Sequence, residues 1–380
     1  MKTKTFKTNL FPILLPILFC CGVFIPEARA ATINAVSCSQ ADVQSAINSA
    51  GDGGTVTVPT GNCNWSGTIN INKQRLTIQG AGVGQTIITS SDQLFSTVGE
   101  SANGLRVTAI EFRNCVQCFY FDGSGSPKEA TKNFRIDQCK FKDVYVAFET
   151  DGEATGVLDH NVFEDSYGTR IYGSNSASAT FPFTMGTSNA VFFEDNTIDM
   201  ISTCQPHFIA SNSGARYVLR HNTFNLTKTG CGWLDTIDAH GHCEVAGRGS
   251  FTWEVYNNVF NTPNESNDIR LMHFRGGQGL VYGNSASGRT TINISLNEYA
   301  YCSPPCVESC SSYPCKDQIN HTYIWNNAQI WLWDSCENAI QKGRDYYETQ
   351  MPGYTPYTYP HPLVGGTDSP PSPPKNIRIR

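Results

Sequence analysis

The 380-residue sequence predicts a parallel β-helix, an all-β solenoid in which short strands stack coil upon coil. The main observation is a degenerate repeat of six residues. It begins with an apolar residue and two polar residues, has a fourth position that is often Asn, and ends with one further residue and an apolar residue. Clear copies lie at residues 136–141, 158–163, 193–198, 219–224 and 255–260, and weaker copies at 281–284 and 324–327. The shortest spacing between fourth positions is 22 residues, from Cys139 to Asn161, and longer spacings indicate insertions.

Composition and the character of the repeat support this fold. Charged residues make up 16% and aromatic residues 11% of the chain, which argues against disorder and against a coiled coil. Helical repeats are excluded because β-branched and aromatic residues dominate the units. A propeller needs a longer, steadier period, and a β-sandwich needs no in-phase Asn. We expect Asn to suit a turn because it tolerates left-handed backbone, and stacked Asn side chains to form a hydrogen-bonded ladder.

The N-terminal elements follow in order. Residues 1–30 are predicted to be a signal peptide, with an early basic region, an apolar stretch and Ala28-Arg29-Ala30 as the cleavage site. A helix is predicted at residues 41–50, where the apolar residues share one face, and it would cap the open end of the solenoid. Strands are predicted at residues 55–59, 69–71, 76–78 and 86–88, with a turn at 60–62.

The chain is predicted to form one β-helix domain at residues 31–365. Residues 33–100 hold the N-terminal cap and first coils, and residues 300–365 the irregular, Cys- and aromatic-rich C-terminal coils and cap. Residues 366–380 are predicted to be a disordered Pro-rich tail or linker.

Charge and cysteine content indicate the compartment. Without residues 1–30 the chain keeps 23 basic and 32 acidic residues, a net charge of −9, and 13 of its 15 Cys. We predict a secreted monomer, extracellular or on the cell surface, with the periplasm as the alternative and no membrane span in the mature chain. The acidic balance excludes nucleic acid as the main partner and leaves polysaccharide open.

The cysteines predict disulfides rather than a metal site. Local pairs Cys38–Cys63 and Cys231–Cys243 are expected, and the cysteines between 302 and 315 are expected to staple a loop instead of binding zinc. An odd count of 13 leaves at least one thiol unpaired or paired with another molecule.

Residues 42–47 (DVQSAI) and 53–61 (GGTVTVPTG) resemble the N-terminal signature of the pectate-lyase-like right-handed parallel β-helix superfamily. The Asn-centred coils resemble its repeats, and the resemblance covers roughly residues 33–365. The chain most resembles a branch of secreted bacterial β-helix proteins with Asp-Ala-His-Gly and Arg-Gly-Gly segments. The resemblance implies a right-handed coil and a polysaccharide partner. The superfamily includes lyases, hydrolases, C5-epimerases, tailspikes and adhesins, so the activity stays open.

Residues 234–242 (LDTIDAHGH) hold two carboxylates and two imidazoles. Alternating side chains in an extended strand would place Asp238, His240 and His242 on one face. One coil later, Leu271, His273 and Arg275 would share a face. The predicted catalytic residues are Asp238, His240, His273 and Arg275, and the predicted substrate-binding residues are Arg220, Arg248, Arg270, His242 and Trp233.

Such a group suits β-elimination in an acidic polysaccharide, with His240 as the base, Asp238 orienting it and Arg275 neutralising a uronate carboxylate. The Asp238-Ala239-His240 segment is similar to the Asp-Pro-His segment of mannuronan C5-epimerases, with Ala in place of Pro, so a uronan C5-epimerase is one alternative. A non-catalytic carbohydrate-binding surface or adhesion protein is the other. Asp238 and His240 would then form a structural turn, and the arginines would pair with acids on neighbouring coils.

The sequence predicts no definite cofactor, and either an arginine or a bound cation could neutralise the uronate carboxylate. A Ca²⁺ site is conceivable because carboxylate oxygens gather in one stretch, at Asp151, Glu153, Asp159, Glu164 and Asp165. The same acids would otherwise be solvated. Leu158-Asp159-His160 is faintly similar to the Ile-Asp-His segment of pectate lyases, although the triplet also fits a generic coil turn.

Overall fold

The computed structural model describes residue 1 and residues 31–174, 185–204, 207–231, 235–241, 248–262, 269–294, 318–334 and 340–365. The predicted signal peptide, the cysteines between 302 and 315 and the Pro-rich tail lie outside the described residues, as do Trp233 and His242. Among the described residues, no helix has the length and apolar character needed to cross a membrane.

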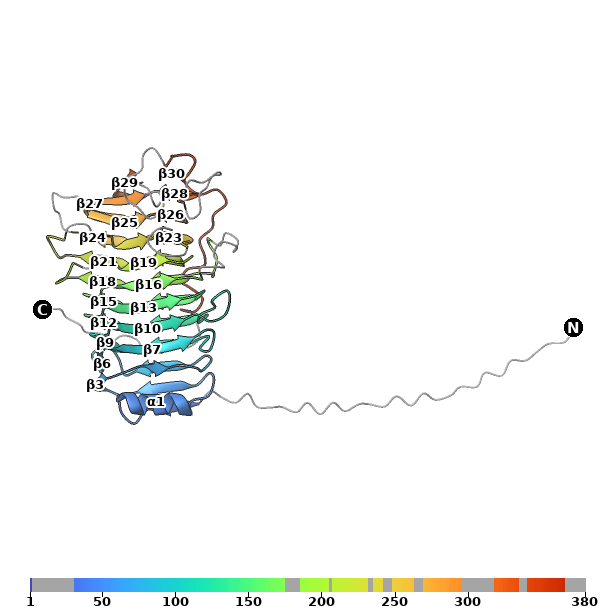
Figure 1. Ribbon diagram of the computed structural model, residues 1–380, viewed down its shortest axis with the longest axis vertical. Coiled ribbons are helices and arrows are strands. Elements are labelled where there is room, and N and C mark those ends of the chain that lie inside the picture. The colour runs from blue at the N-terminus through green and yellow to red at the C-terminus, as the bar shows by residue number, and fades with distance from the viewer. Residues whose placement is uncertain are drawn as a thin grey trace.

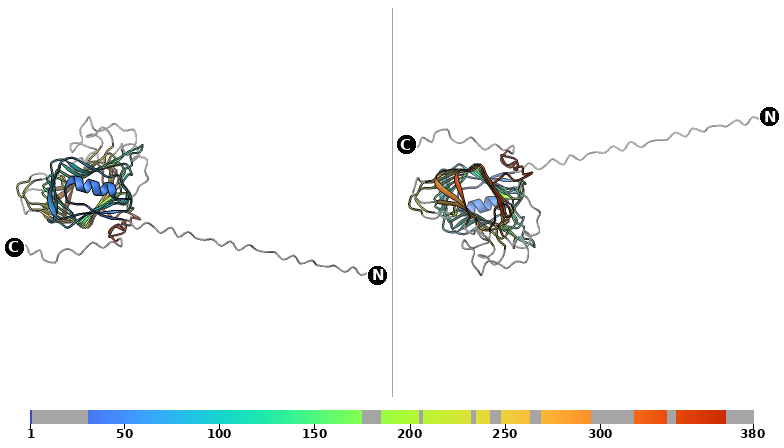
Figure 2. Two further views of the ribbon diagram at one scale, coloured as in Figure 1. Left: turned by 90° about the horizontal axis from the view of Figure 1, so that it is seen from below. Right: turned by 90° about the horizontal axis from the view of Figure 1, so that it is seen from above.

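The described strands form a parallel β-helix, as predicted (Figure 1). One coil contains β14 (Gly156–Asp159), β15 (Val162–Glu164) and β16 (Thr169–Tyr172), and each strand pairs in parallel with its equivalent in the next coil. The three resulting stacks are named face 1, face 2 and face 3 in chain order. Seen end-on in Figure 2, the coils enclose the core as a closed tube.

Face 1 is the twelve-stranded sheet of the described chain. Its remaining strands are β1 (Thr32–Asn34), β2 (Thr55–Val58), β5 (Thr77–Gly80), β8 (Arg106–Thr108), β11 (Phe134–Asp137), β17 (Val191–Glu194), β20 (Arg216–Arg220), β23 (Thr252–Tyr256), β26 (Gln278–Tyr282), β28 (Thr322–Trp325) and β30 (Tyr346–Tyr347).

Faces 2 and 3 join through the long strand β27 (Ser285–Ile294), which pairs with strands of both. The other strands of face 2 are β3 (Gly61–Trp65), β6 (Thr86–Ser90), β9 (Glu111–Arg113), β12 (Lys140–Lys142), β18 (Thr197–Met200), β21 (Thr223–Leu226) and β24 (Val259–Asn261). The other strands of face 3 are β4 (Ile69–Asn70), β7 (Gln93–Val98), β10 (Gln117–Asp122), β13 (Val146–Asp151), β19 (Ile209–Asn212), β22 (Ile237–Ala239), β25 (Ile269–Phe274) and β29 (Ala328–Asp334).

The predicted asparagine ladder is confirmed at the corner between faces 1 and 2. Its rungs are Asn161, Asn196, Asn222, Asn258, Asn284 and Asn327, and the Nδ2 of each of the first five donates to the Oδ1 of the next at 2.9–3.0 Å. The expectation that Asn takes the left-handed backbone is wrong. The residue before each rung does so, as His160 (φ 54°) and His221 (φ 57°) show, because the buried Asn amide must point along the stack.

The N-terminal cap forms as predicted. Helix α1 (Gln40–Ser49) begins where the Ser39 side chain accepts a hydrogen bond from the Asp42 amide, and it lies across the open end of the tube (Figures 1 and 2). The predicted turn at residues 60–62 is wrong, since β3 begins at Gly61. A Cβ at Gly61 would lie 2.4 Å from Cys38 Sγ, so only glycine fits beside the disulfide there.

Three disulfides link described cysteines. Cys38–Cys63 is confirmed, but Cys231 pairs with Cys204 and not with Cys243 as predicted. The physical reason is coil stacking, because β18 and β21 are hydrogen-bonded neighbours and the segments that follow them lie side by side. The sequence reading missed Cys115–Cys118. Cys139 is a free, buried cysteine and precedes the first rung of the Asn ladder, where its amide donates to Asn161 Oδ1.

A C-terminal strap, defined as residues 354–364, runs back along the outer surface of face 1. Its contacts descend coil by coil, from Tyr354 bonded to Glu254 of β23 to Leu363 bonded to Arg135 of β11. Residues Tyr357, Leu363 and Val364 pack over a buried patch of face 1 strands. The C-terminal region, which the sequence predicts to be an irregular cap, therefore also covers part of the side of the solenoid.

Candidate functional site

Face 3 brings together the ionisable residues predicted between 235 and 275. Strand β22 buries Ile237 and Ala239 in the core, so Asp238 between them projects from the outer surface. Its register partner in β25 is His273. The group of His207, Asp235, Asp238, His240, Arg270, His273 and Arg275 is called the face 3 cluster below.

The expected alternation through β25 is wrong at one position. A register shift between Arg270 and Met272 marks a β-bulge, and it turns both Leu271 and Met272 into the core. Leu271 therefore does not share the face of His273. Met272 and Phe274 are buried, and the bulge places Arg270 and His273 together beside β22.

The centre of the cluster is the carboxylate of Asp238, which is 1% exposed. Arg275 binds both of its oxygens, Nη2 to Oδ2 at 2.5 Å and Nε to Oδ1 at 3.2 Å. His240 Nε2 lies 3.1 Å from Oδ2, and its side chain is 16% exposed. Burial alone would raise the pKa of Asp238, but the charge of Arg275 and the contact with His240 hold it far below the usual range, so this carboxylate stays ionised.

A second carboxylate, Asp235, lies beside the first. Arg270 binds both of its oxygens, and His273 Nδ1 lies 3.7 Å from Oδ2. Burial would raise the pKa of Asp235, yet its contacts with His273 and Arg270 lower it. His273 is 2% exposed, and burial lowers its pKa, so this imidazole is neutral at neutral pH.

The sequence reading missed His207, the most exposed imidazole of the cluster at 26% of its side chain. Its Nδ1 donates to the Asp235 backbone carbonyl at 2.9 Å and lies 3.8 Å from Asp238 Oδ2. In the neutral ring the lone pair is then on Nε2. A signal was present, because Ile209 and Ile237 are register partners and aligning these two coils places His207 next to Asp235.

Two predicted substrate-binding residues lie apart from the cluster centre. Arg220 is on face 1, fully buried, with its guanidinium bound to Glu194 and to the carbonyls of the strap, so the expectation that it contacts substrate is wrong. Arg248 lies at the corner after β22, where its carbonyl accepts from Ser213. The adjoining Gly249 packs so closely that a Cβ would lie 2.8 Å from His240 O, which keeps this corner beside the cluster.

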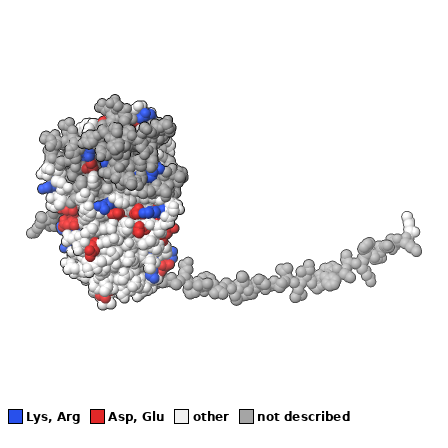
Figure 3. Space-filling view, viewed as in Figure 1, with Lys and Arg blue, Asp and Glu red and all other residues white. Residues whose placement is uncertain are grey.

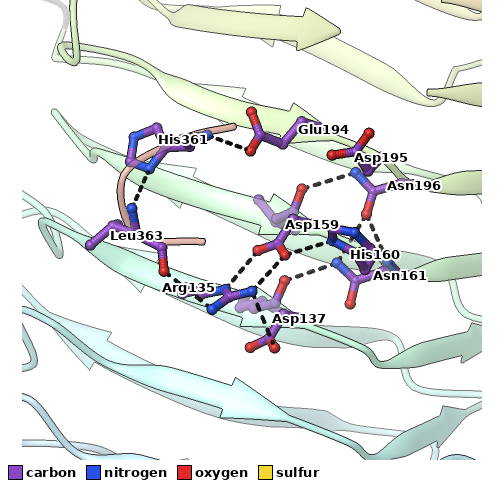
Figure 4. Close-up of polar contacts among 12 residues, drawn as sticks. Arg135, Asp137, Asp159, His160, Asn161, Glu194, Asp195, Asn196, His361 and Leu363 are labelled. Carbon is purple, nitrogen blue, oxygen red and sulfur yellow. Dashed lines mark hydrogen bonds and ion pairs between the residues drawn. The ribbon is translucent and has the colours of Figure 1, made fainter. Parts of the chain in front are cut away.

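The acids considered for Ca²⁺ do not converge on one site. Asp159 on face 1 is bound by Arg135 and His160, as Figure 4 shows, while Glu164 on face 2 is bound by Lys140 and Lys142. Glu153 pairs with Arg216, Asp151 with Lys128, and Asp165 accepts backbone amides from residues 201–203. These acids therefore do not form one shared calcium site, and no group of three metal-ligating side chains occurs in the described part of the chain.

Among the described residues on the side seen in Figure 3, basic and acidic side chains lie next to one another. Within the face 3 cluster, two guanidinium groups likewise balance two carboxylates. The cluster therefore has imidazoles that can transfer protons, and they lie beside arginine and carboxylate groups that pair with one another.

Comparisons with known proteins give only distant similarity. No protein-family model matches the chain, and no curated protein does. Among solved structures, the alginate lyase AlyF-OU02 with G6 is 12% identical with a TM-score of 0.43, covering 80% of this chain and 64% of that chain. An alginate lyase from Paenibacillus sp. str. FPU-7 is 11% identical with a TM-score of 0.41, covering 79% and 99%. The Azotobacter vinelandii mannuronan C-5 epimerase AlgE4 A-module is 15% identical with a TM-score of 0.32, covering 77% and 92%. Similarity this low carries no information about the activity of this chain.

Proposed function

We propose that the chain is a polysaccharide lyase that cleaves an acidic, uronate-containing polymer by β-elimination at the face 3 cluster. The observation that carries the proposal is the pair of His240 and Asp238, 3.1 Å apart, in which a partly exposed imidazole rests on a buried, ionised carboxylate. A carboxylate that fixes one ring nitrogen orients the imidazole for proton transfer.

The second imidazole completes the acid–base requirement. In β-elimination the C5 proton passes to a base, its electron pair forms the C4–C5 double bond, and the C4–O bond breaks while the leaving oxygen gains a proton. His207 suits the base, because its Nδ1–H is donated to a carbonyl and Nε2 carries the lone pair. His240 on Asp238 then suits the proton donor, with the transferred proton on Nδ1, the nitrogen that does not contact Asp238 and that lies 3.1 Å from Arg275 Nη2. This assignment replaces the expectation that His240 is the base.

The arginines supply the charge that the reaction requires. Arg270 and Arg275 are 14% and 12% exposed and lie beside the imidazoles. Both pair with carboxylates of the chain, so they act on the developing enolate as nearby positive charges and position Asp235 and Asp238. His273, buried and neutral, is proposed as a spacer between the two carboxylates.

Secretion is part of the proposal. The basic and apolar pattern of residues 1–30 and the three disulfides support an oxidising compartment outside the cytoplasm. We propose that the mature chain acts as a monomer on an extracellular or cell-surface polymer.

The test is to incubate the chain with alginate and with polygalacturonate and to follow the ultraviolet absorbance of the unsaturated uronate product. The proposal predicts a rise in absorbance with at least one polymer, and a loss of about 100-fold or more in His207→Ala, because general base catalysis contributes that much. Binding to a polymer without any rise in absorbance would contradict the lyase assignment.

A non-catalytic carbohydrate-binding protein is the second candidate. The observation that favours it is the burial of Asp238 and His273, whose contacts link one coil to the next as a structural network would. An epimerase is separated from both by incubation in D₂O, since it exchanges the C5 hydrogen of an unbroken polymer.

A further inference from the structure

The outer surface of face 3 continues in register beyond the cluster toward the C-terminal end. His273 of β25 is the register partner of Asn293 in β27, and Asn293 is the partner of Trp333 in β29. Trp331 of the same strand is the partner of Thr291. The cluster and the β29 tryptophans therefore belong to one column that runs along the axis of the solenoid.

The β29 tryptophans are exposed on this surface. Ile330 and Leu332 pack against the core, so Trp331 and Trp333 project outward from alternate positions. They are 54% and 44% exposed, unusual for side chains of this size. Their positions two residues apart place the two Cα atoms about 6.6 Å from one another along the strand, so both side chains project from the same surface; the pair is called the aromatic platform below.

The residue between the platform and the cluster is a buried amide without hydrogen bonds. Asn293 is 0% exposed, and neither its Nδ2 nor its Oδ1 has a partner. The buried rungs of the corner ladder, such as Asn258, use both amide atoms in hydrogen bonds. A buried amide that makes no hydrogen bond destabilises the folded chain, so its retention here needs an explanation, and a bound polar group supplies one.

We propose that Trp331, Trp333 and Asn293 form a sugar-binding subsite for a polysaccharide that lies along the solenoid axis; this inference rests on the proposed function of the face 3 cluster. The tryptophan rings stack on the apolar faces of sugar rings, and the Asn293 amide bonds to a hydroxyl or carboxylate. Asn293 is 0% exposed in the free chain, so the proposal requires that the side chains over it move when the sugar binds.

The spacing fits a chain of sugars. Trp333 and His273 are two coils apart, about 9.6 Å between their strands, which is close to the length of a disaccharide unit. A polymer whose uronate lies at His207 and His240 then places a sugar over the tryptophans further along. The subsite therefore binds substrates long enough to reach it and is not used by the shortest ones.

The test measures steady-state kinetics of Trp331→Ala and Trp333→Ala on alginate and polygalacturonate, and on trimers and hexamers of the same uronates. KM for the polymer and hexamer rises about tenfold, kcat changes much less, and KM for the trimer stays within twofold. Tyr347→Ala is the matched control, since Tyr347 stacks on Tyr323 at the same end of the solenoid but on face 1, and its KM values stay unchanged.

Asn293→Leu separates a ligand contact from a structural role. An amide that bonds only to ligand can be replaced by an apolar group of similar shape without loss of folding stability, so the denaturation midpoint stays level or rises while KM for the polymer rises several-fold. A lower midpoint with unchanged KM would contradict the ligand role.

Failure of the subsite and failure of the lyase assignment give different results. Cleavage by the wild-type chain with unchanged KM in both tryptophan variants overturns the subsite and leaves the lyase standing. Binding without cleavage, measured by affinity electrophoresis in gels that contain the same polymers, supports the subsite if the tryptophan variants lose it and overturns only the lyase. Absence of both binding and cleavage with both polymers overturns the two together.

Discussion

Two groups of the same composition, Arg, Asp and His, lie on different faces of this solenoid. On face 1, Asp159 accepts hydrogen bonds from Arg135 at 2.9 and 2.8 Å and from His160 at 2.9 Å (Figure 4). On face 3, the same residue types meet around Asp238. Both carboxylates are almost fully buried, so the chemistry of the carboxylate does not separate the two groups.

The two groups differ in the residues that surround the carboxylates. His160 occupies the left-handed corner position that other coils fill with Gln138, Asp195 or His221, so the fold accepts several residue types there. The strap also lies over this group, where the Leu363 carbonyl accepts from Arg135. On face 3, a second, more exposed imidazole, His207, lies 3.8 Å from Asp238. The comparison teaches that an Asp–His contact becomes a candidate site only with a second proton-transfer group beside it.

The largest effect on stability is expected at Arg220, the centre of face 1 beneath the strap. Its ion pair with Glu194, at 2.6 Å, is fully buried on both sides. Arg220→Ala leaves a buried carboxylate without its cation and lowers the free energy of unfolding by about 3–5 kcal/mol, as measured by chemical denaturation. The exposed pair of Lys128 and Asp151 is the control, where Lys128→Ala changes stability by less than about 1 kcal/mol. Equal effects at the two sites would contradict the burial of face 1.

The packing of the strap itself is tested at Phe192, which points out from face 1 and is buried against Tyr357 and His361. Phe192→Ala lowers the free energy of unfolding by about 3–5 kcal/mol when the strap is docked in solution. Tyr145, an exposed residue directly before β13, is the control, with a small expected loss in Tyr145→Ala. A loss below about 1 kcal/mol at Phe192 would mean that the strap does not cover face 1.

The pH dependence of stability also tests whether the strap covers face 1. Burial, and after it the charge of Arg220, lowers the pKa of His361 to about 4 from the usual 6.5. Above pH 6.5 both folded and unfolded states are neutral; as the pH falls toward 4 the unfolded state takes up the proton first, and stability falls by roughly 3 kcal/mol. His361→Gln removes this loss, which denaturation at several pH values measures as a flatter slope in that window. An unchanged slope would contradict the burial of His361 under the strap.

A smaller effect is expected in the asparagine ladder, which lies at the corner between faces 1 and 2. Asn222 donates to Asn258 and accepts from Asn196, so Asn222→Ala leaves buried groups unbonded and lowers the free energy of unfolding by about 1–3 kcal/mol. Substitution of the partly buried terminal rung, Asn327→Ala, is the comparison and costs less, because solvent replaces part of its hydrogen bonds. A cost at Asn222 no larger than at Asn327 would contradict the cooperative ladder.

The sequence was sufficient for the architecture because a solenoid repeats one local pattern. Periodic apolar residues and in-phase Asn predicted the coils, the ladder and the capping helix. The β-bulge at Leu271 was not predictable, since a one-residue insertion leaves the composition of a strand unchanged. Likewise the pairing of Cys204 with Cys231 depends on which coils are neighbours, and so does the position of His207 beside Asp235.

The prediction failed most clearly where side chains are covered by distant segments. Arg220 is buried because a strap more than one hundred residues later binds it, and no local pattern near Arg220 signals this. Trp333 differs from Arg220 because it stays exposed, as a residue on the outer surface of β29. Register between coils, rather than spacing along the chain, decides which predicted residues meet.

The most direct test of the central claim, that the Asp–His pair of face 3 and not that of face 1 does the chemistry, compares His240→Ala with His160→Ala. The measurement is the rate of unsaturated uronate formation from alginate or polygalacturonate, with the thermal midpoint of each variant as the folding control. His240→Ala loses about 100-fold or more in rate with a native midpoint, and His160→Ala keeps the wild-type rate within about twofold. Loss of activity in His160→Ala with retention in His240→Ala would place the chemistry on face 1 and contradict the account.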